Sequence, residues 1–171
     1  DLLAKYLEIS KIPCFRGDLN NVLNRFCTLC SYQNIKPEDT IIRLTADNPL
    51  VDNKIIEKMK VIWESYDLDY LSAEPDDLTK HGWPKGLSAE FFRAQSIYQI
   101  NNNGADKIIK EHVTSSIKKF SKKKKNMVEF EKLGFSFKLR YGIDFLKDYL
   151  FVEKLFQEVN WDVNYDKILE K

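Results

Sequence analysis

The stretch "IIRLTADNPLVD", residues 41–52, decides the fold class. Its first residues are largely apolar and β-branched, which is typical of a buried strand. Asn48 and Pro49 end that strand, because proline cannot donate to a ladder of strand hydrogen bonds. The strand therefore leads to a carboxylate, Asp47, and two interpretations stay open. Asp47 either turns the chain and caps the next helix, or holds a metal ion at the carboxyl edge of a sheet.

Strands and helices alternate on both sides of this stretch. Strands are predicted within 11–18, 39–46, 68–74, 87–94 and 135–143. Helices are predicted over 1–10, 19–33, 53–66, 94–102, 106–120 and 145–159. This alternation predicts an α/β fold, a three-layer sandwich with a mostly parallel sheet. Because we find neither an internal repeat nor a dividing linker, we expect a single α/β domain over 1–171.

Composition and charge exclude several classes of protein. Lys+Arg 27 against Asp+Glu 26 leaves a net charge of +1, so no nucleic-acid partner and no acidic membrane is expected. The chain shows no apolar run of membrane-spanning length and no signal peptide, and its odd cysteine number indicates reduced thiols and a cytoplasmic protein. Cys27 and Cys30 lie on the apolar face of a predicted helix, where we expect core residues, not zinc ligands. The lysine run at 122–126 is predicted to be a solvated connection.

A second stretch, "FKLRYGIDFLKD" at 137–148, repeats the pattern of the first. A predicted strand leads to Asp144, and a helix follows. Open α/β sheets bind ligands beyond the carboxyl ends of their strands, and carboxylates are the hard oxygen ligands that Mg²⁺ requires. Aspartate is also a preferred N-cap residue, so the capping interpretation stays open for Asp144 as it does for Asp47.

From about residue 11 onward, the chain resembles the cytidylyltransferase family, and most closely its branch named spore-coat polysaccharide biosynthesis protein F. "IPCFRGDLNNVLNRF" resembles that branch's "IPVFRGSEEDVLDRY", and "IIRLTADNPLVD" resembles "IVRITGDCPLID". "PKGLSAEFF" resembles "PDGLDVEVF", and "KEHVTSSI" resembles "REHVTPYI". "LRYGIDFLKDYLFVEKLF" aligns without a gap on "LRLTVDYPEDFELVRKIF". These blocks follow the family's order and cover most of the chain.

The resemblance implies a fold, a reaction and a set of site residues. The fold is that of nucleotide-diphospho-sugar transferases. Family members use CTP to activate an acidic or modified sugar, such as sialic acid or 3-deoxy-manno-octulosonate, to a CMP-sugar for surface polysaccharide or glycan synthesis. The aspartates that match the family's magnesium ligands are Asp47 and Asp144. By the same match, Glu90 and His112 line the sugar side, and Arg16 and Arg25 lie near the nucleotide.

The chain departs from the family most clearly at its start. Members begin with a strand and a Gly-rich loop of the form "ARxGSxRLPGK", whose backbone N–H groups and lysine cradle the triphosphate. Nothing here resembles that loop, so the chain matches the family's fold without its first strand–helix unit. The enzyme interpretation therefore applies to a longer parent chain that carries the loop. At the site itself, Ala46 replaces a glycine, and Gly142 replaces a threonine.

Two other functions stay open. A non-catalytic α/β binding module would keep the fold without the reaction. A nucleotide-sugar glycosyltransferase is suggested by Asp67 and Asp69, a DxD-like pair whose carboxylates would face the same side of a strand. The resemblance also implies a homodimer formed through an excursion at 80–135. Aromatic and aliphatic side chains in that stretch either face the partner or fill a local core: Trp83, Phe91, Phe92, Tyr98 and Ile100.

Overall fold

The computed structural model describes residues 1–77, 83–102, 113–129 and 140–159 of the chain. It divides into two compact units, each built from two separated stretches of sequence. The first unit comprises 1–39 and 93–120, and the second comprises 40–92 and 121–171. The single domain expected over 1–171 stays a prediction. Within the described ranges, no helix combines the length and the apolar character needed to cross a membrane.

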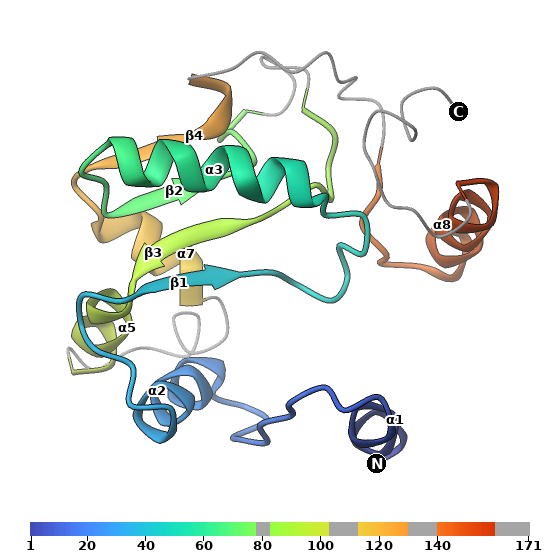
Figure 1. Ribbon diagram of the computed structural model, residues 1–171, viewed down its shortest axis with the longest axis horizontal. Helices are drawn as coiled ribbons and strands as arrows, with labels where there is room; N and C mark the ends of the chain where they lie inside the picture. The colour runs from blue at the N-terminus through green and yellow to red at the C-terminus, as the bar shows by residue number, and fades with distance from the viewer. Residues whose placement is uncertain (78–82, 103–112, 130–139, 160–171) are drawn as a thin grey trace. The chain divides into compact units, whose positions relative to one another are not determined.

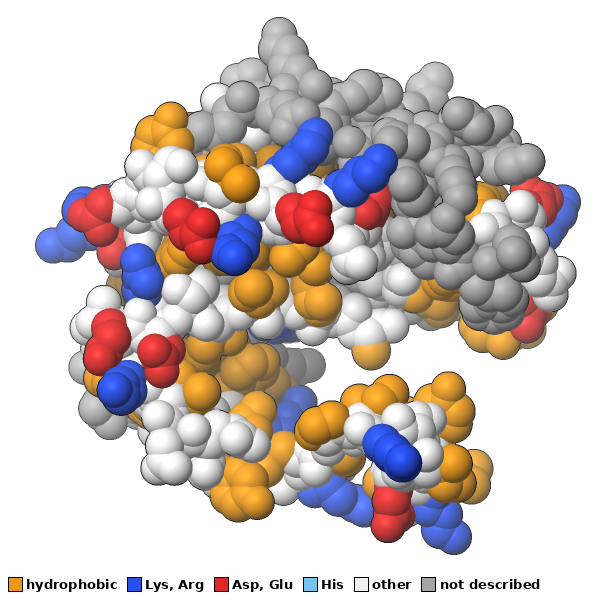
Figure 2. Space-filling model, viewed as in Figure 1, with side chains coloured by type: hydrophobic (Ala, Val, Ile, Leu, Met, Phe, Trp, Pro, Cys, Tyr) orange, Lys and Arg blue, Asp and Glu red, His pale blue; other side chains and the backbone are white. Residues whose placement is uncertain are grey.

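The first unit is built from helices α1 (Leu2–Ile9), α2 (Val22–Tyr32), α5 (Ala94–Asn102) and α7 (Val113–Phe120) (Figure 1). Helix α5 packs against both α2 and α7. Helix α2 begins at Asn21, whose side chain accepts a hydrogen bond from Asn24 N. This cap satisfies one of the four N–H groups that a helix start leaves unpaired. The apolar side chains of α1 stay exposed, and Figure 2 shows hydrophobic atoms gathered over that helix.

The cysteine pair lies inside the first unit, as the sequence predicted. Cys27 and Cys30 are 8% and 4% exposed on the inner face of α2. Burial raises the pKa of both thiols, which therefore stay protonated and behave as small apolar groups. The prediction of a short strand within 11–18 is wrong. No strand of the described chain pairs with this segment, which begins at a left-handed residue, Lys11, with φ 55°.

The second unit contains a four-stranded sheet in the order β1-β3-β2-β4. Its strands are β1 (Thr40–Arg43), β2 (Tyr70–Ser72), β3 (Glu90–Arg93) and β4 (Lys124–Asn126). Strands β2 and β4 are parallel, with Leu71 opposite Lys125, whereas β3 is antiparallel to β2, with Leu71 opposite Phe91. The predicted α/β fold is confirmed, and β3 makes the described sheet a mixed one (Figure 1).

Helix α3 (Asn53–Ser65) covers one face of this sheet. The Trp63 ring lies 6.0 Å from the Phe91 ring on β3, and its indole N–H donates to Thr40 Oγ1 at 2.9 Å. Both contacts therefore mark the α3 face of β1 and β3. Helix α8 (Leu146–Glu158) contributes Val152 and Leu155 to the same hydrophobic core.

The lysine run forms strand β4 at the edge of the described sheet, so the prediction of a simple connection is wrong. Asp69 fixes it in place, because its Oδ2 accepts hydrogen bonds from the backbone N–H groups of Lys122 and Lys123 at 3.2 and 3.0 Å. Asp67 pairs with the Lys123 ammonium. The DxD-like pair thus ties β4 to β2, and the exposed lysines guard a strand edge against further pairing.

Candidate active site

Three loops of the second unit meet at one place, which we call the aspartate site. They are the loop after β1 (residues 45–49), the turn at 85–86, and the segment 140–148 that leads into α8. Ile143 N donates to the Asp47 backbone carbonyl at 2.8 Å. Tyr141 N donates to the Lys85 carbonyl at 2.7 Å. Backbone bonds alone therefore bring the loop that carries Asp47 beside the segment that carries Asp144.

Two glycines allow this close approach. Gly86 has a φ of +100°, a conformation that side-chain-bearing residues rarely adopt. A Cβ atom at Gly86 would lie 2.2 Å from Gly142 N, far inside van der Waals contact. The Gly86 N–H donates to Glu74 Oε1 at 2.9 Å, which fixes the turn from its other side. The glycine at 86 is therefore required for the site to form.

The capping interpretation is excluded for both predicted ligands. Helix α3 is capped by Asp52, whose Oδ1 accepts from Lys54 N at 2.7 Å. Ahead of α8, Asp148 Oδ2 accepts from the backbone N–H groups of Asp144 and Phe145 at 3.0 and 2.9 Å. These backbone N–H donors hold the pKa of Asp148 below its usual value. Neither Asp47 nor Asp144 uses its carboxylate to start a helix.

The two carboxylates differ in their surroundings. Asp144 is ion-paired with Arg140, and the Lys85 ammonium lies 3.6 Å from its Oδ2. Asp47 is exposed, and within the described part of the chain no hydrogen bond or ion pair reaches its carboxylate. The site thus presents one unengaged carboxylate and one that is balanced by two exposed cationic side chains.

The donor set fits a magnesium ion that also binds phosphate. Among the described residues, no group of three His, Cys, Asp or Glu side chains is placed to hold a metal. Mg²⁺ commonly takes only one or two protein carboxylates and completes its shell with water and substrate phosphates. Asp47 and Asp144 supply that number of carboxylates. A structural zinc site, which needs four protein ligands, does not fit.

Glu90 lies on the sheet face away from α3, held from two sides. Its Oε2 lies 2.5 Å from the Arg43 guanidinium of β1, and its Oε1 accepts from the Tyr70 hydroxyl of β2 at 2.6 Å. Burial, and then the Glu90 carboxylate, raise the pKa of Tyr70. Sequence reasoning missed Arg43 and Tyr70 as partners of Glu90. Opposite charges on two strands were visible, but their pairing depends on the strand order.

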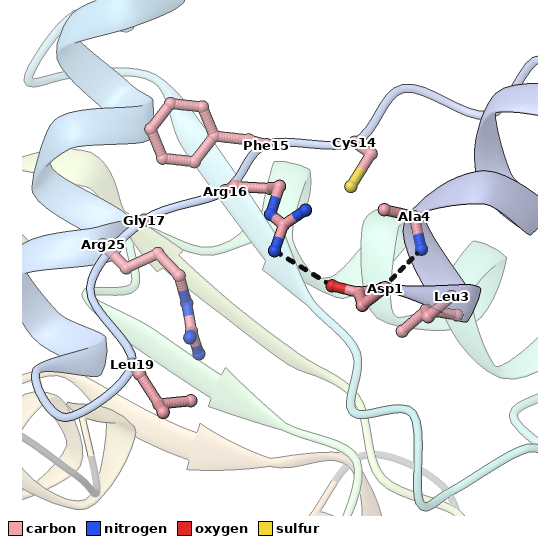
Figure 3. Close-up of a pocket in the computed structure, with 9 residues that line it drawn as sticks. All are labelled: Asp1, Leu3, Ala4, Cys14, Phe15, Arg16, Gly17, Leu19 and Arg25. Carbon is pink, nitrogen blue, oxygen red and sulfur yellow. Dashed lines mark hydrogen bonds and ion pairs between the residues drawn. The ribbon is translucent and has the colours of Figure 1, made fainter.

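Arg16 and Arg25 come together in the first unit. Figure 3 shows both side chains lining a pocket of about 370 Å³, together with Asp1, Leu3, Ala4, Cys14, Phe15, Gly17 and Leu19. Arg16 pairs with Asp1 at 3.1 Å, and Arg25 donates to the Asp18 carbonyl at 3.2 Å. The pocket therefore offers two guanidinium groups to an anion, only one of them facing a carboxylate.

The remaining predicted residues divide into two groups. His112 lies outside the described residues. Trp83, Phe91, Phe92 and Ile100 are buried within the chain at 1%, 1%, 0% and 6% exposure. Tyr98 is partly buried, and its hydroxyl donates to the Ile35 carbonyl at 3.2 Å. For the buried side chains, the interpretation as a local core is therefore the one that holds, and they offer no surface to a partner.

Comparisons with known proteins show which family the sequence matches and which solved fold it resembles. The model of the family described as cytidylyltransferase matches residues 2–168. An uncharacterized protein of Methanocaldococcus jannaschii is 30% identical over 162 residues, which cover 89% of this chain and 60% of that protein. A solved cytidylyltransferase structure from Leptospira borgpetersenii is similar with a TM-score of 0.74 at 21% identity, over 92% of this chain and 64% of that chain. The chain thus spans less than two thirds of the length of either protein.

Proposed function

Because the chain belongs to the cytidylyltransferase family, we propose that it forms part of an enzyme that transfers CMP from CTP to an acidic or modified sugar. One observation carries the proposal to particular residues. The Asp47 and Asp144 loops are joined by the 2.8 Å bond from Ile143 N to Asp47 O, and neither carboxylate caps a helix. Two carboxylates held together and left available for a ligand are what phosphate-bound magnesium requires.

In the proposed reaction, a sugar hydroxyl attacks the α-phosphate of CTP. The new bond joins the sugar oxygen to that phosphorus, and the hydroxyl proton passes to water. The bond to the bridging oxygen breaks, and pyrophosphate leaves with the electron pair. Asp47 and Asp144 would hold Mg²⁺, which supplies neutralisation of the charge on the phosphate oxygens. The protein's own task is to hold the loops that carry these two carboxylates side by side, and the backbone bonds between the loops serve that end.

The remaining site residues are assigned by the family match and supported in part by their surroundings. Arg16 and Arg25 face a shared pocket, which suits the phosphates of a nucleotide. Glu90 and His112 are proposed for the sugar side. Both carboxylate oxygens of Glu90 already have partners within the protein. We therefore propose that Glu90 acts indirectly, by positioning the Arg43 side chain on the sugar side of the site.

We also propose a cytoplasmic homodimer, on the family match and on three cysteines that are free in the structure. The interface would have to use surfaces other than the buried aromatic residues of 80–135. Light scattering at micromolar concentration tests this directly. A dimer mass is expected, and a monomer mass would contradict it.

The enzyme proposal is tested by nucleotide binding and turnover on the full-length protein that carries the phosphate loop. With Mg²⁺, CTP is expected to raise the melting temperature by about 2 °C or more, because a ligand that binds only the folded state stabilises it. Pyrophosphate release would then be measured with a panel of acidic sugars. Asp47→Asn and Asp144→Asn should each lower turnover by more than about a hundredfold. Lys154→Gln, an exposed change on α8, serves as the control.

The result that would overturn the proposal is a full-length wild-type protein that CTP and Mg²⁺ neither stabilise nor react with. That outcome favours a non-catalytic α/β binding module. A nucleotide-sugar glycosyltransferase would instead bind a UDP-sugar with Mn²⁺ through Asp67 and Asp69. Its weakness is that Asp69 already accepts two backbone hydrogen bonds from the β4 segment.

A further inference from the structure

We infer that Arg140 is a stand-in cation at the aspartate site, which holds the Asp144 carboxylate until a divalent cation replaces it. The inference rests on the proposed function, because it takes Asp144 as a metal ligand. It adds a positioning residue that acts through Asp144. It also implies that the affinity of the empty site for a metal is set by competition within the protein.

The geometry places Arg140 between two carboxylates. Its guanidinium pairs with Asp144, and the same Nη2 atom lies 3.8 Å from Asp148 Oδ2. The backbone of Arg140 is held by the bridge to Lys85, so the side chain can move while its Cα stays fixed. Arg140 and Asp144 side chains are 37% and 46% exposed, and water can therefore replace either partner.

Asp148 provides the second resting place for the guanidinium. Its side chain is only 12% exposed and is fixed by the backbone N–H groups of Asp144 and Phe145. A carboxylate that is anchored by two backbone hydrogen bonds stays in position. When Asp144 turns to a metal ion, Arg140 therefore keeps a carboxylate within reach and needs no new conformation of the backbone.

The energetics allow the exchange. An exposed ion pair contributes little to stability, so a divalent ion that brings substrate phosphates can displace Arg140. Until Arg140 moves, its charge repels the incoming ion. For charges of +1 and +2 about 5 Å apart in water at physiological salt, that repulsion weakens binding by roughly threefold to tenfold. Lys85 adds a smaller repulsion of the incoming ion, because its ammonium lies 3.6 Å from Asp144 and its side chain is 56% exposed.

The test measures Mn²⁺ binding to the nucleotide-free chain by electron paramagnetic resonance, and therefore does not depend on activity. Arg140→Gln removes the cation and keeps a polar side chain of similar length. Arg140→Lys keeps the charge, and Lys154→Gln removes one positive charge from α8 away from the cluster. Asp144→Asn and the double variant Arg140→Gln/Asp144→Asn show which bound Mn²⁺ belongs to this site. Circular dichroism verifies that each variant folds.

The expected result is Mn²⁺ binding that is roughly threefold to tenfold tighter in Arg140→Gln than in the wild type. Arg140→Lys and Lys154→Gln should stay close to the wild type, and the gain should vanish in the double variant. Equal affinity in Arg140→Gln and the wild type, with binding lost in Asp144→Asn, overturns the stand-in cation while the metal site survives. Mn²⁺ binding that Asp144→Asn leaves unchanged overturns the metal site itself, and the stand-in with it.

Discussion

Glu90 and Asp144 are both carboxylates of the second unit that pair with an arginine, yet their surroundings are opposite. The Glu90 side chain is 13% exposed, and each of its oxygens has a partner, from Arg43 on one strand and Tyr70 on another. The Asp144 side chain is 46% exposed and is balanced by Arg140 and Lys85, both from flanking loops. Burial and the number of fixed partners separate the two sites.

This difference distinguishes a structural charge, whose partners are fixed, from an exchangeable charge, whose partners water or a ligand can replace. Breaking a pair that is largely shielded from water leaves an uncompensated ion, whereas an exposed pair can trade its partner for water or a ligand at little cost. Glu90 therefore acts as a strut, by which we mean a side chain on β3 that links the sheet by binding Arg43 of β1 and Tyr70 of β2. Asp144 is available for a ligand because its cations are weakly held. The sequence resemblance predicts that both belong to a site, and the structure shows that their surroundings differ.

If the partners of the Asp144 carboxylate are exchangeable, the backbone segment that carries Asp144 has to be held in place by other contacts. Gly86→Ala tests these contacts and should have the largest effect, a loss of at least about 3 kcal/mol in the free energy of unfolding. The added Cβ would lie 2.2 Å from Gly142 N, at a φ of +100°. Urea unfolding measures the change.

Gly17→Ala is the matched control for that change. The nearest atoms to its Cβ would be side-chain atoms, Arg25 Cγ at 2.7 Å and Phe15 Cε1 at 3.2 Å, and its backbone is not left-handed. The arginine can move aside, so the loss should stay below about 1 kcal/mol. Equal losses for the two glycines would mean that the packing at Gly86 is not what holds the aspartate site.

Glu90→Gln comes next in size and tests the strut. The substitution keeps the shape of the side chain and removes its charge, so the Arg43 guanidinium, whose side chain is 26% exposed, loses the charged carboxylate that lies 2.5 Å from it. We expect the free energy of unfolding to fall by about 2 kcal/mol. A double-mutant cycle with Arg43→Met should return a coupling of about 1 kcal/mol or more between the two residues. Additive losses would show that Glu90 and Arg43 do not act as a pair.

Tyr70, which donates to Glu90, makes the free energy of unfolding depend on pH in the alkaline range. Its pKa is raised in the folded state, first by burial and then by Glu90, so the unfolded tyrosine loses its proton at lower pH than the folded one. Stability is therefore fully present below about pH 10, and is lost as the pH rises above that value. Relative to Tyr70→Phe, the wild type should lose about 1 kcal/mol more between pH 10 and pH 11. Urea unfolding at pH 8, 10 and 11 measures it, and parallel curves for the two proteins would contradict it.

The sequence predicted the long helices and the central strands, because their apolar spacing is regular. Helices α3 and α8 and strand β1 fall within the predicted ranges. It failed where pairing decides the outcome. The lysine run shows no strand pattern, yet it forms β4 because Asp69 holds its backbone beside β2. The segment 11–18 has strand-like residues but no strand to pair with among the described ones.

At the aspartate site, the sequence located both aspartates but left capping open, since Asp, Asn and Ser all start helices. The structure removes that interpretation by giving the caps to Asp52 and Asp148, residues that the sequence did not single out. Arg140 was equally invisible as a partner of Asp144. An arginine four residues before an aspartate at a strand end carries no signal until the chain's turn brings them together.

Asp144→Asn applies to the exposed site the same carboxylate-to-amide change that Glu90→Gln applies to the buried one, and it should have the smallest effect on stability. The free energy of unfolding should change by no more than about 0.5 kcal/mol, because water solvates Arg140 and Lys85 once their partner is neutral. Urea unfolding of both variants at neutral pH measures the contrast directly. A loss from Asp144→Asn that matched the loss from Glu90→Gln would contradict the distinction between structural and exchangeable charge, because Asp144 would then be a strut as well. A negligible loss means that the ion pairs of Asp144 contribute little to the stability of the fold, so that a ligand can replace them at little cost.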